Sequence, residues 1–250
     1  MPNDPDKLLK IYSLHDKDYL DEKKKDIDNL IKFSREEKIP EIVIPIGLIY
    51  LDDLFIGELL PRVYGHTASL VVYDNEVSFN KKIKVFENIG KILYKVQYSK
   101  PKFNACYSDV HLDNFMVSDN KVLAIDSSSM KIYDSKGITN FYLYQLSTMD
   151  IEKYELDEEG TVIPDKNTDI YCFIMMILRF LSGSDLYILN VKKYKEYLNK
   201  LVDNGFDEEL INCFNSIYEE DTENINPLVH LNTLYDLDEE KLTLERKIFK

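Results

Sequence analysis

The sequence predicts an α+β fold of two lobes, a reduced small lobe built on an antiparallel sheet and a larger lobe that is mainly helical. Three observations predict it. Residues 1–62 show a strand, a helix and two further strands, a connector containing Pro61 and Gly65 follows, and apolar residues then recur mostly at helical spacing. With 250 residues, 44% of them hydrophobic, the chain is long enough for two lobes that share a core. We therefore expect a small lobe over 1–62 and a large lobe over 63–250.

The first expected strand is "KLLKIY", residues 7–12. Its side chains alternate, so that Leu8, Lys10 and Tyr12 share one face, which is typical of a half-buried strand. Lys10 then projects from the face of a sheet.

A helix over residues 18–37 follows, and its apolar residues form a rough stripe along one side. Two short strands, 41–50 and 54–60, are separated by Asp52 and Asp53, which are turn residues. The small lobe is therefore expected to hold three strands and one helix.

The large lobe is expected to begin with a helix over residues 81–98, ending before Pro101. A second helix, "NTDIYCFIMMILRFLSG", is apolar on nearly every face and stops at Gly183, so it should be buried all round. Shorter helices are expected from residue 191 to about residue 234.

Composition excludes several classes of function. The formal net charge of −14 opposes binding to a phosphate backbone, so we expect no nucleic acid partner. No apolar run approaches the ~20 residues of a membrane span, so we expect a soluble protein that does not bind membranes. Cys106, Cys172 and Cys213 are odd in number and lie in apolar surroundings, which indicates reduced thiols and a cytoplasmic location.

The stretch "YSDVHLDNFMV" combines Asp109, His111 and Asn114 just ahead of an apolar run. "FMVSDNKVLAI" then predicts a hairpin that turns at Asp119 and Asn120, so that Asn114 and Asp126 emerge side by side at its open end. An amide oxygen and a carboxylate together are ligands that Mg²⁺ takes when phosphate and water complete its octahedron.

Asp109 lies on the loop that enters this hairpin and can accept a proton from an attacking hydroxyl group. Taken singly, each residue also has a structural explanation: Asp109 can cap a turn, Asn114 can satisfy loop backbone, and Asp126 can end a strand. The ordered set of elements around them favours the chemical interpretation.

That order resembles the protein kinase fold from Lys10 to about residue 235. "KLLKIY" resembles the strand whose lysine holds the α- and β-phosphates of ATP, and "YSDVHLDN" is similar to the catalytic loop H-R-D-x-x-x-x-N. The resemblance implies Asp109 as the catalytic base, Asn114 as a metal ligand and Asp126, in the place of the D-F-G aspartate, as the main Mg²⁺ ligand.

The resemblance also implies three further positions. Asp169, at the start of the buried helix, would hold the backbone of the catalytic loop. "GELLPRVYG", which contains Glu58, resembles the hinge between lobes, and Leu8 stands where the family usually has alanine above the adenine. Lys10, Leu8 and Glu58 are thus the expected cofactor-binding residues.

The sequence also departs from the family. No glycine occurs in the nine residues before Lys10, where the glycine-rich loop would lie, so we expect slow turnover or weak affinity. The glutamate that usually pairs with the lysine is replaced by Asp26 or Asp28, and this choice stays open. Ser108 replaces the arginine of the H-R-D motif, so a phosphorylated activation loop would find no basic group there.

Further departures follow Asp126. Ser127 and Ser128 replace the Phe and Gly of the D-F-G motif. The A-P-E glutamate has only Glu152 as a candidate, and its usual arginine partner appears as Asn226.

These features predict a slow phosphotransferase that uses ATP and Mg²⁺ and modifies a protein hydroxyl group. One alternative is a pseudokinase that acts as a binding or regulatory module. The other is a small-molecule kinase, which His111 favours, because histidine two places after the base resembles the aminoglycoside and choline kinases; a purely structural His111 is also open. The stretch 127–166 would carry a peptide substrate or regulate access to the site. Its possible modification sites are Ser135, Thr139, Ser147 and Thr148.

Overall fold

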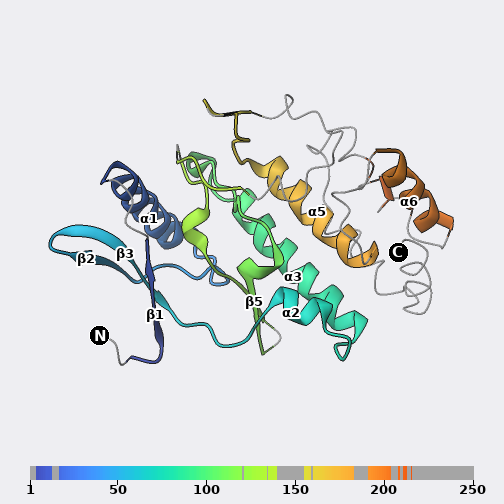
Figure 1. Cartoon of the computed structure of the whole chain (residues 1–250), viewed down its shortest axis with the longest axis horizontal. Coiled ribbons are helices and arrows are strands. Elements are labelled where there is room, and N and C mark those ends of the chain that lie inside the picture. The colour runs from blue at the N-terminus through green and yellow to red at the C-terminus, as the bar shows by residue number, and fades with distance from the viewer. Residues whose placement is uncertain are drawn as a thin grey trace.

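The architecture comes from a computed structural model. It describes residues 4–12, 17–119, 121–133, 135–139, 155–158, 160–182 and 191–203, and residues 208, 211, 212 and 215. Within this part the fold is α+β, with an antiparallel sheet near the N-terminus followed mainly by helices, as the sequence predicts (Figure 1).

The small lobe holds three strands, β1 (Lys7–Ile11), β2 (Gly47–Leu51) and β3 (Leu54–Pro61). They form one sheet of order β1-β3-β2, and both pairings are antiparallel. Helix α1 (Lys17–Glu37) lies between β1 and β2 in sequence and packs Leu20 and Ile27 against Phe55 of β3. The predicted series of strand, helix, strand, strand is therefore confirmed.

The expectation that β1 is half buried is wrong. Leu8, Leu9 and Ile11 are 43%, 54% and 52% exposed, and Lys10 alone in this strand is partly sheltered. The reason lies in the topology, because β1 is an edge strand and pairs with β3 alone among the described strands. Alternation of side chains predicted the strand but could not predict how many neighbours the strand would have.

The large lobe begins with the two-residue strand β4 (His66–Thr67), which pairs with β5 (Phe115–Ser118), and β5 pairs in turn with β6 (Lys121–Ala124). The predicted hairpin is therefore confirmed, with Asp119 at its turn in a left-handed conformation of φ 45°. The described helices of this lobe are α2 (Ala68–Tyr73), α3 (Phe79–Gln97), α5 (Lys166–Ser182) and α6 (Val191–Asp203).

Helices α3, α5 and α6 agree with the helices expected from residues 81, 167 and 191 onward. The short helices expected further along the tail fall largely outside the described residues. No described helix has both the length and the apolar character to cross a membrane.

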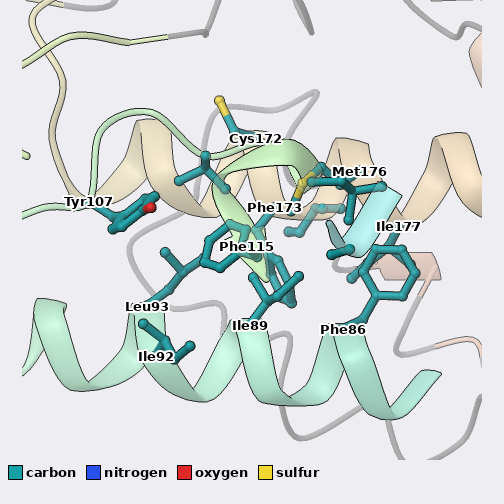
Figure 2. Close-up of a cluster of buried hydrophobic side chains, with 14 of the residues drawn as sticks. Phe86, Ile89, Ile92, Leu93, Tyr107, Phe115, Cys172, Phe173, Met176 and Ile177 are labelled. Carbon is teal, nitrogen blue, oxygen red and sulfur yellow. The ribbon is translucent and has the colours of Figure 1, made fainter. Parts of the chain in front are cut away.

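The main core lies where α3 and α5 close on the hairpin. Figure 2 shows Phe115 of β5 between side chains of α3 and of α5. Phe115 is fully buried, and its ring stacks on that of Tyr107 with 5.2 Å between centroids. Cys172 is a free thiol in this core, Cys106 is a buried free thiol on the loop before Tyr107, and burial raises the pKa of each well above its ordinary value. Both thiols are therefore buried and favour the protonated form.

A short segment after α1 joins the two sheets. The Val43 N–H donates to the Ala124 carbonyl at 2.9 Å, and the Ala124 N–H donates to the Glu41 carbonyl at 2.8 Å. The C-terminal half of α1 also contributes Leu30 and Phe33 to the main core. Helix α1 thus contacts the main core as well as Phe55 of the small sheet. The boundary between lobes at residue 62 therefore stays a prediction.

The start of α5 is tied to the loop before the hairpin by a buried carboxylate. Asp169 is fully buried, and it accepts the backbone N–H groups of Tyr107 and Ser108 at 2.6 and 2.8 Å. This is the contact that the kinase resemblance implies for Asp169. Burial raises the pKa of Asp169 from 3.8 to about 7, although the two backbone hydrogen bonds act in the opposite direction.

We predict that replacing Asp169 by Asn makes stability less dependent on pH between 4 and 7. A raised pKa means that the folded state binds more protons than the unfolded state in this window, so the stabilising contribution of Asp169 is complete below pH 4 and is lost as the pH rises through 7. The free energy of unfolding of the wild type, relative to Asp169→Asn, should fall by a few kcal/mol across this window, at about 1.4 kcal/mol per pKa unit.

Denaturant melts of both proteins at pH 4.5, 6 and 7.5 measure this difference. The other titrating groups are common to both proteins and largely cancel. A difference that stays constant or grows with pH would show that the carboxylate is charged at little cost in the folded state.

Candidate functional site

The predicted base and one predicted metal ligand touch each other. The side-chain amide of Asn114 donates from Nδ2 to the Asp109 carbonyl at 2.9 Å and to Oδ2 of its carboxylate at 2.7 Å. Asn114 ends the short 3₁₀ turn Leu112–Asn114, directly before β5, and is 7% exposed. Since the amide nitrogen is used by Asp109, the amide oxygen is the atom with which Asn114 can hold a cation.

The hairpin register brings the segment of Asp126 alongside Asn114. The Ile125 N–H donates to the Asn114 carbonyl at 2.8 Å. The Tyr107 hydroxyl donates to the carbonyls of Ile125 at 2.5 Å and Asn114 at 3.2 Å, so one buried phenol spans the open end of the hairpin. Asp126 is the next residue after Ile125.

Asp126 occupies a left-handed conformation, with φ 55° and ψ 36°, which aspartate tolerates better than most side chains. The 3₁₀ turn Ser127–Ser129 follows it, and all three serines are buried. Ser127 donates its hydroxyl to the Val43 carbonyl at 2.6 Å, and Ser129 donates to the Asp126 carbonyl at 2.8 Å. Hydrogen bonds thus hold the turn in which Ser127 and Ser128 stand where the kinase resemblance has Phe and Gly.

Lys10 reaches this turn from β1. Its ammonium contacts the Asp126 carboxylate directly, donates to the Ser128 hydroxyl at 2.9 Å, and lies 3.6 Å from Oε1 of Glu58. Lys10 and Asp126 are each about one-third exposed. A partly exposed lysine and the aspartate at the end of the hairpin are therefore brought together from positions 116 residues apart.

The expectation that Asp26 or Asp28 pairs with Lys10 is wrong. Asp26 lies 3.8 Å from Lys23, one turn earlier on α1, and Asp28 is on the exposed face of that helix. Glu58 takes the place instead, since it is directly opposite Lys10 in the β1–β3 register. Cross-strand neighbours have Cβ atoms only about 5 Å apart. The sequence did not reveal this pairing because register depends on distant residues.

Two of the expected cofactor-binding residues differ in accessibility. Leu8 shares a face with Lys10, is opposite Leu60 and is 43% exposed, so a bound molecule can reach it. Glu58 is fully buried and also accepts the Tyr12 hydroxyl at 3.1 Å. A bound molecule would therefore meet Lys10 rather than the carboxylate of Glu58.

The acidic groups outnumber the basic ones here. Asp126 and Glu58 lie around one ammonium, that of Lys10, and burial together with the charge of Glu58 raises the pKa of Tyr12. Within the described part of the chain no group of three or more His, Cys, Asp or Glu residues could cage a metal. The oxygens of Asn114 and Asp126 nevertheless suit Mg²⁺, which keeps several waters and binds through one or two protein ligands plus phosphates.

His111 lies between two carboxylates. Its Nε2 is 3.6 Å from Oδ2 of Asp109, and its Nδ1 is 4.0 Å from Oδ2 of Asp113. This position next to the expected base is compatible with contact to a transferring group and with a purely structural role, so both alternatives stay open.

Ser108, which replaces the family's arginine, is buried and accepts the Lys131 N–H at 3.0 Å. It therefore joins the loop to the segment that follows Asp126. Of the expected modification sites, Ser135 accepts the Ile132 N–H at 2.8 Å, and Thr139 is partly exposed. The remaining candidates, Ser147, Thr148, Glu152, Asn226 and Cys213, lie outside the described residues.

Comparison with known proteins supports the fold alone. No protein-family model and no curated protein matches this sequence. Among the 978 matching chains of solved structures, one described as "Structure of vaccinia related kinase 3" has 13% sequence identity and a TM-score of 0.54. The alignment covers 92% of this chain and 80% of that one. Sequence identity this low carries no information on activity, but the coverage and the loop geometry agree: the chain has a protein-kinase-like fold.

Proposed function

We propose that this protein binds ATP with Mg²⁺ and slowly transfers a phosphoryl group to a hydroxyl group of a protein. One observation carries the proposal. Lys10 contacts Asp126. The neighbouring residue, Ile125, is hydrogen-bonded to Asn114, and the side-chain amide of Asn114 donates to Asp109. A fold alone does not require these four polar groups together in a partly exposed site.

Each residue has a role that its position permits. Lys10 binds the α- and β-phosphates, and Asp126 and the amide oxygen of Asn114 hold the ion. Bound Mg²⁺ neutralises charge that develops on the phosphate oxygens. Asp109, oriented by the Asn114 amide, accepts the proton of the attacking hydroxyl group.

Slow transfer follows from the contact between Lys10 and Asp126. The ammonium is bound by the carboxylate that the ion needs, so Lys10 must exchange Asp126 for phosphate before both can act. We also propose a cytoplasmic setting and a protein partner, since the thiols of Cys106 and Cys172 are free and the net charge of −14 repels nucleic acid.

A binding module that takes up nucleotide without transferring phosphate is the second candidate. The same contact favours it, because an ammonium that stays on Asp126 keeps that carboxylate from an ion. Such a protein would change shape or stability on binding and leave the substrate unmodified.

The first prediction of this proposal concerns binding. Mg²⁺ and ATP at 100 times the dissociation constant should stabilise the wild type by ~2.7 kcal/mol, which raises the melting temperature by several degrees in a thermal scan. Asp126→Asn should abolish the magnesium-dependent part of this shift, because the carboxylate that binds the ion is lost. Asp113→Asn is the matched control: Asp113 is also an aspartate of this region but is exposed, and its variant should behave as the wild type does. Equal shifts in all three proteins would exclude the metal assignment.

The second prediction concerns catalysis. Asp109→Asn keeps an oxygen that can accept the Asn114 amide but removes the base, so it should lower phosphoryl transfer by ~100-fold or more while ATP affinity is nearly unchanged. The assay follows labelled γ-phosphate into the protein itself, into a protein mixture and into water. Wild-type protein that binds ATP but transfers nothing would instead support the binding module, and equal rates for both proteins would remove Asp109 as the base.

A further inference from the structure

Glu58 is a buried carboxylate that is paired and hydrogen-bonded by residues in or directly after strand β1. It is fully buried, Oε1 lies 3.6 Å from the Lys10 ammonium, and the Tyr12 hydroxyl donates to the same oxygen at 3.1 Å. Oε2 is also buried and has no hydrogen-bond partner among the described residues. Of the two groups that contact the carboxylate, Lys10 belongs to β1 and Tyr12 directly follows it.

A buried carboxylate is costly unless it is paired, so Glu58 requires the ammonium of Lys10. Lys10 depends less on Glu58 than Glu58 depends on Lys10. Lys10 is about one-third exposed and has a second carboxylate partner in Asp126. The pair is therefore asymmetric, and the chain retains a carboxylate at a position where an apolar residue would cost less.

The geometry of the sheet fixes this pair. Lys10 and Glu58 are directly opposite in an antiparallel register, and Leu8 and Leu60 continue the same face. In contrast, Asp26 of α1 lies beside Lys23, and Asp28 faces outward. The strand, rather than the helix, thus supplies the carboxylate that holds the lysine.

We propose that Glu58 is the positioning residue that holds the Lys10 ammonium at the phosphate-binding point, so that the position of the lysine does not depend on where α1 lies. This inference rests on the proposed binding of ATP. It assigns different roles to the two carboxylate partners of Lys10. On nucleotide binding, Lys10 exchanges Asp126 for phosphate oxygens and keeps Glu58, which leaves Asp126 free to hold the ion.

The first arm of the test needs no nucleotide. Thermal melts compare the wild type, Lys10→Met, Glu58→Gln and the double variant. Lys10→Met leaves the buried Glu58 carboxylate without its charge partner and should lower the melting temperature more than Glu58→Gln does. The double variant should melt at a higher temperature than Lys10→Met alone, because the unpaired Glu58 carboxylate has been removed. Additive losses would show that the two groups are not coupled and would overturn the inference.

The second arm measures Mg²⁺–ATP affinity by calorimetry. Glu58→Gln should weaken binding by roughly tenfold, since a buried charge partner that positions a binding group is lost, and it should have no further effect in the Lys10→Met background. Glu58→Asp, which keeps the charge, should recover part of the affinity. The matched controls Asp26→Asn and Asp28→Asn should bind as the wild type does, because neither residue holds the lysine.

The outcomes separate this inference from the proposed function. If the wild type binds ATP and folded Glu58→Gln binds it equally well, the positioning role is wrong and the proposed function stands. If Asp26→Asn or Asp28→Asn weakens binding as much as Glu58→Gln does, the helix holds the lysine and the inference is also wrong. A wild type that binds no nucleotide overturns the proposed function, and with it the role of Glu58 toward phosphate, even if the first arm shows coupling.

Discussion

The hydrogen bonds from two backbone N–H groups to the buried carboxylate of Asp169 are the constraint on which the site depends. They hold Tyr107 and Ser108 against the start of α5. With Tyr107 held there, its hydroxyl can span the open end of the hairpin, and the hairpin register then sets Asn114 beside the segment of Asp126. Burial makes ionisation of this carboxyl group costly, and the two backbone hydrogen bonds offset part of that cost while they order the loop.

A second buried charge acts on the other side of the site. Glu58 lies within the small sheet and faces Lys10, while Asp126 meets the same ammonium from the hairpin side. The two halves of the chain are thus joined at one lysine that has alternative partners. This arrangement explains how a site can be preformed and yet still admit an anionic ligand, because one partner can leave while the other remains.

Local patterns were enough to predict much of this structure. The apolar periodicity of α3 and α5, the turn residues of the β5–β6 hairpin and the alternation around Lys10 all reflect neighbours in sequence, and each element is present. Asp109, Asn114 and Asp126 were proposed as site residues in the same way, and a short loop and one hairpin bring their segments near each other.

Features that depend on distant residues could not be predicted. Glu58 faces Lys10 only because β1 and β3 pair in one register, and the exposure of β1 follows from its place at the sheet edge. Ser127 and Ser128 were identified only as departures from the D-F-G motif, yet the Ser127 hydroxyl donates to the Val43 carbonyl, 84 residues earlier. Sequence spacing contains no signal for such contacts.

The central claim is that ATP binds where Lys10 and Asp126 meet. A crystal structure of the protein with Mg²⁺ and a non-hydrolysable ATP analogue tests it most directly. The account predicts phosphate oxygens on the Lys10 ammonium, one ion shared by Asp126 and the amide oxygen of Asn114, and Lys10 still beside Glu58. A nucleotide bound elsewhere, or a Lys10–Asp126 contact left intact in the presence of the bound analogue, would contradict it.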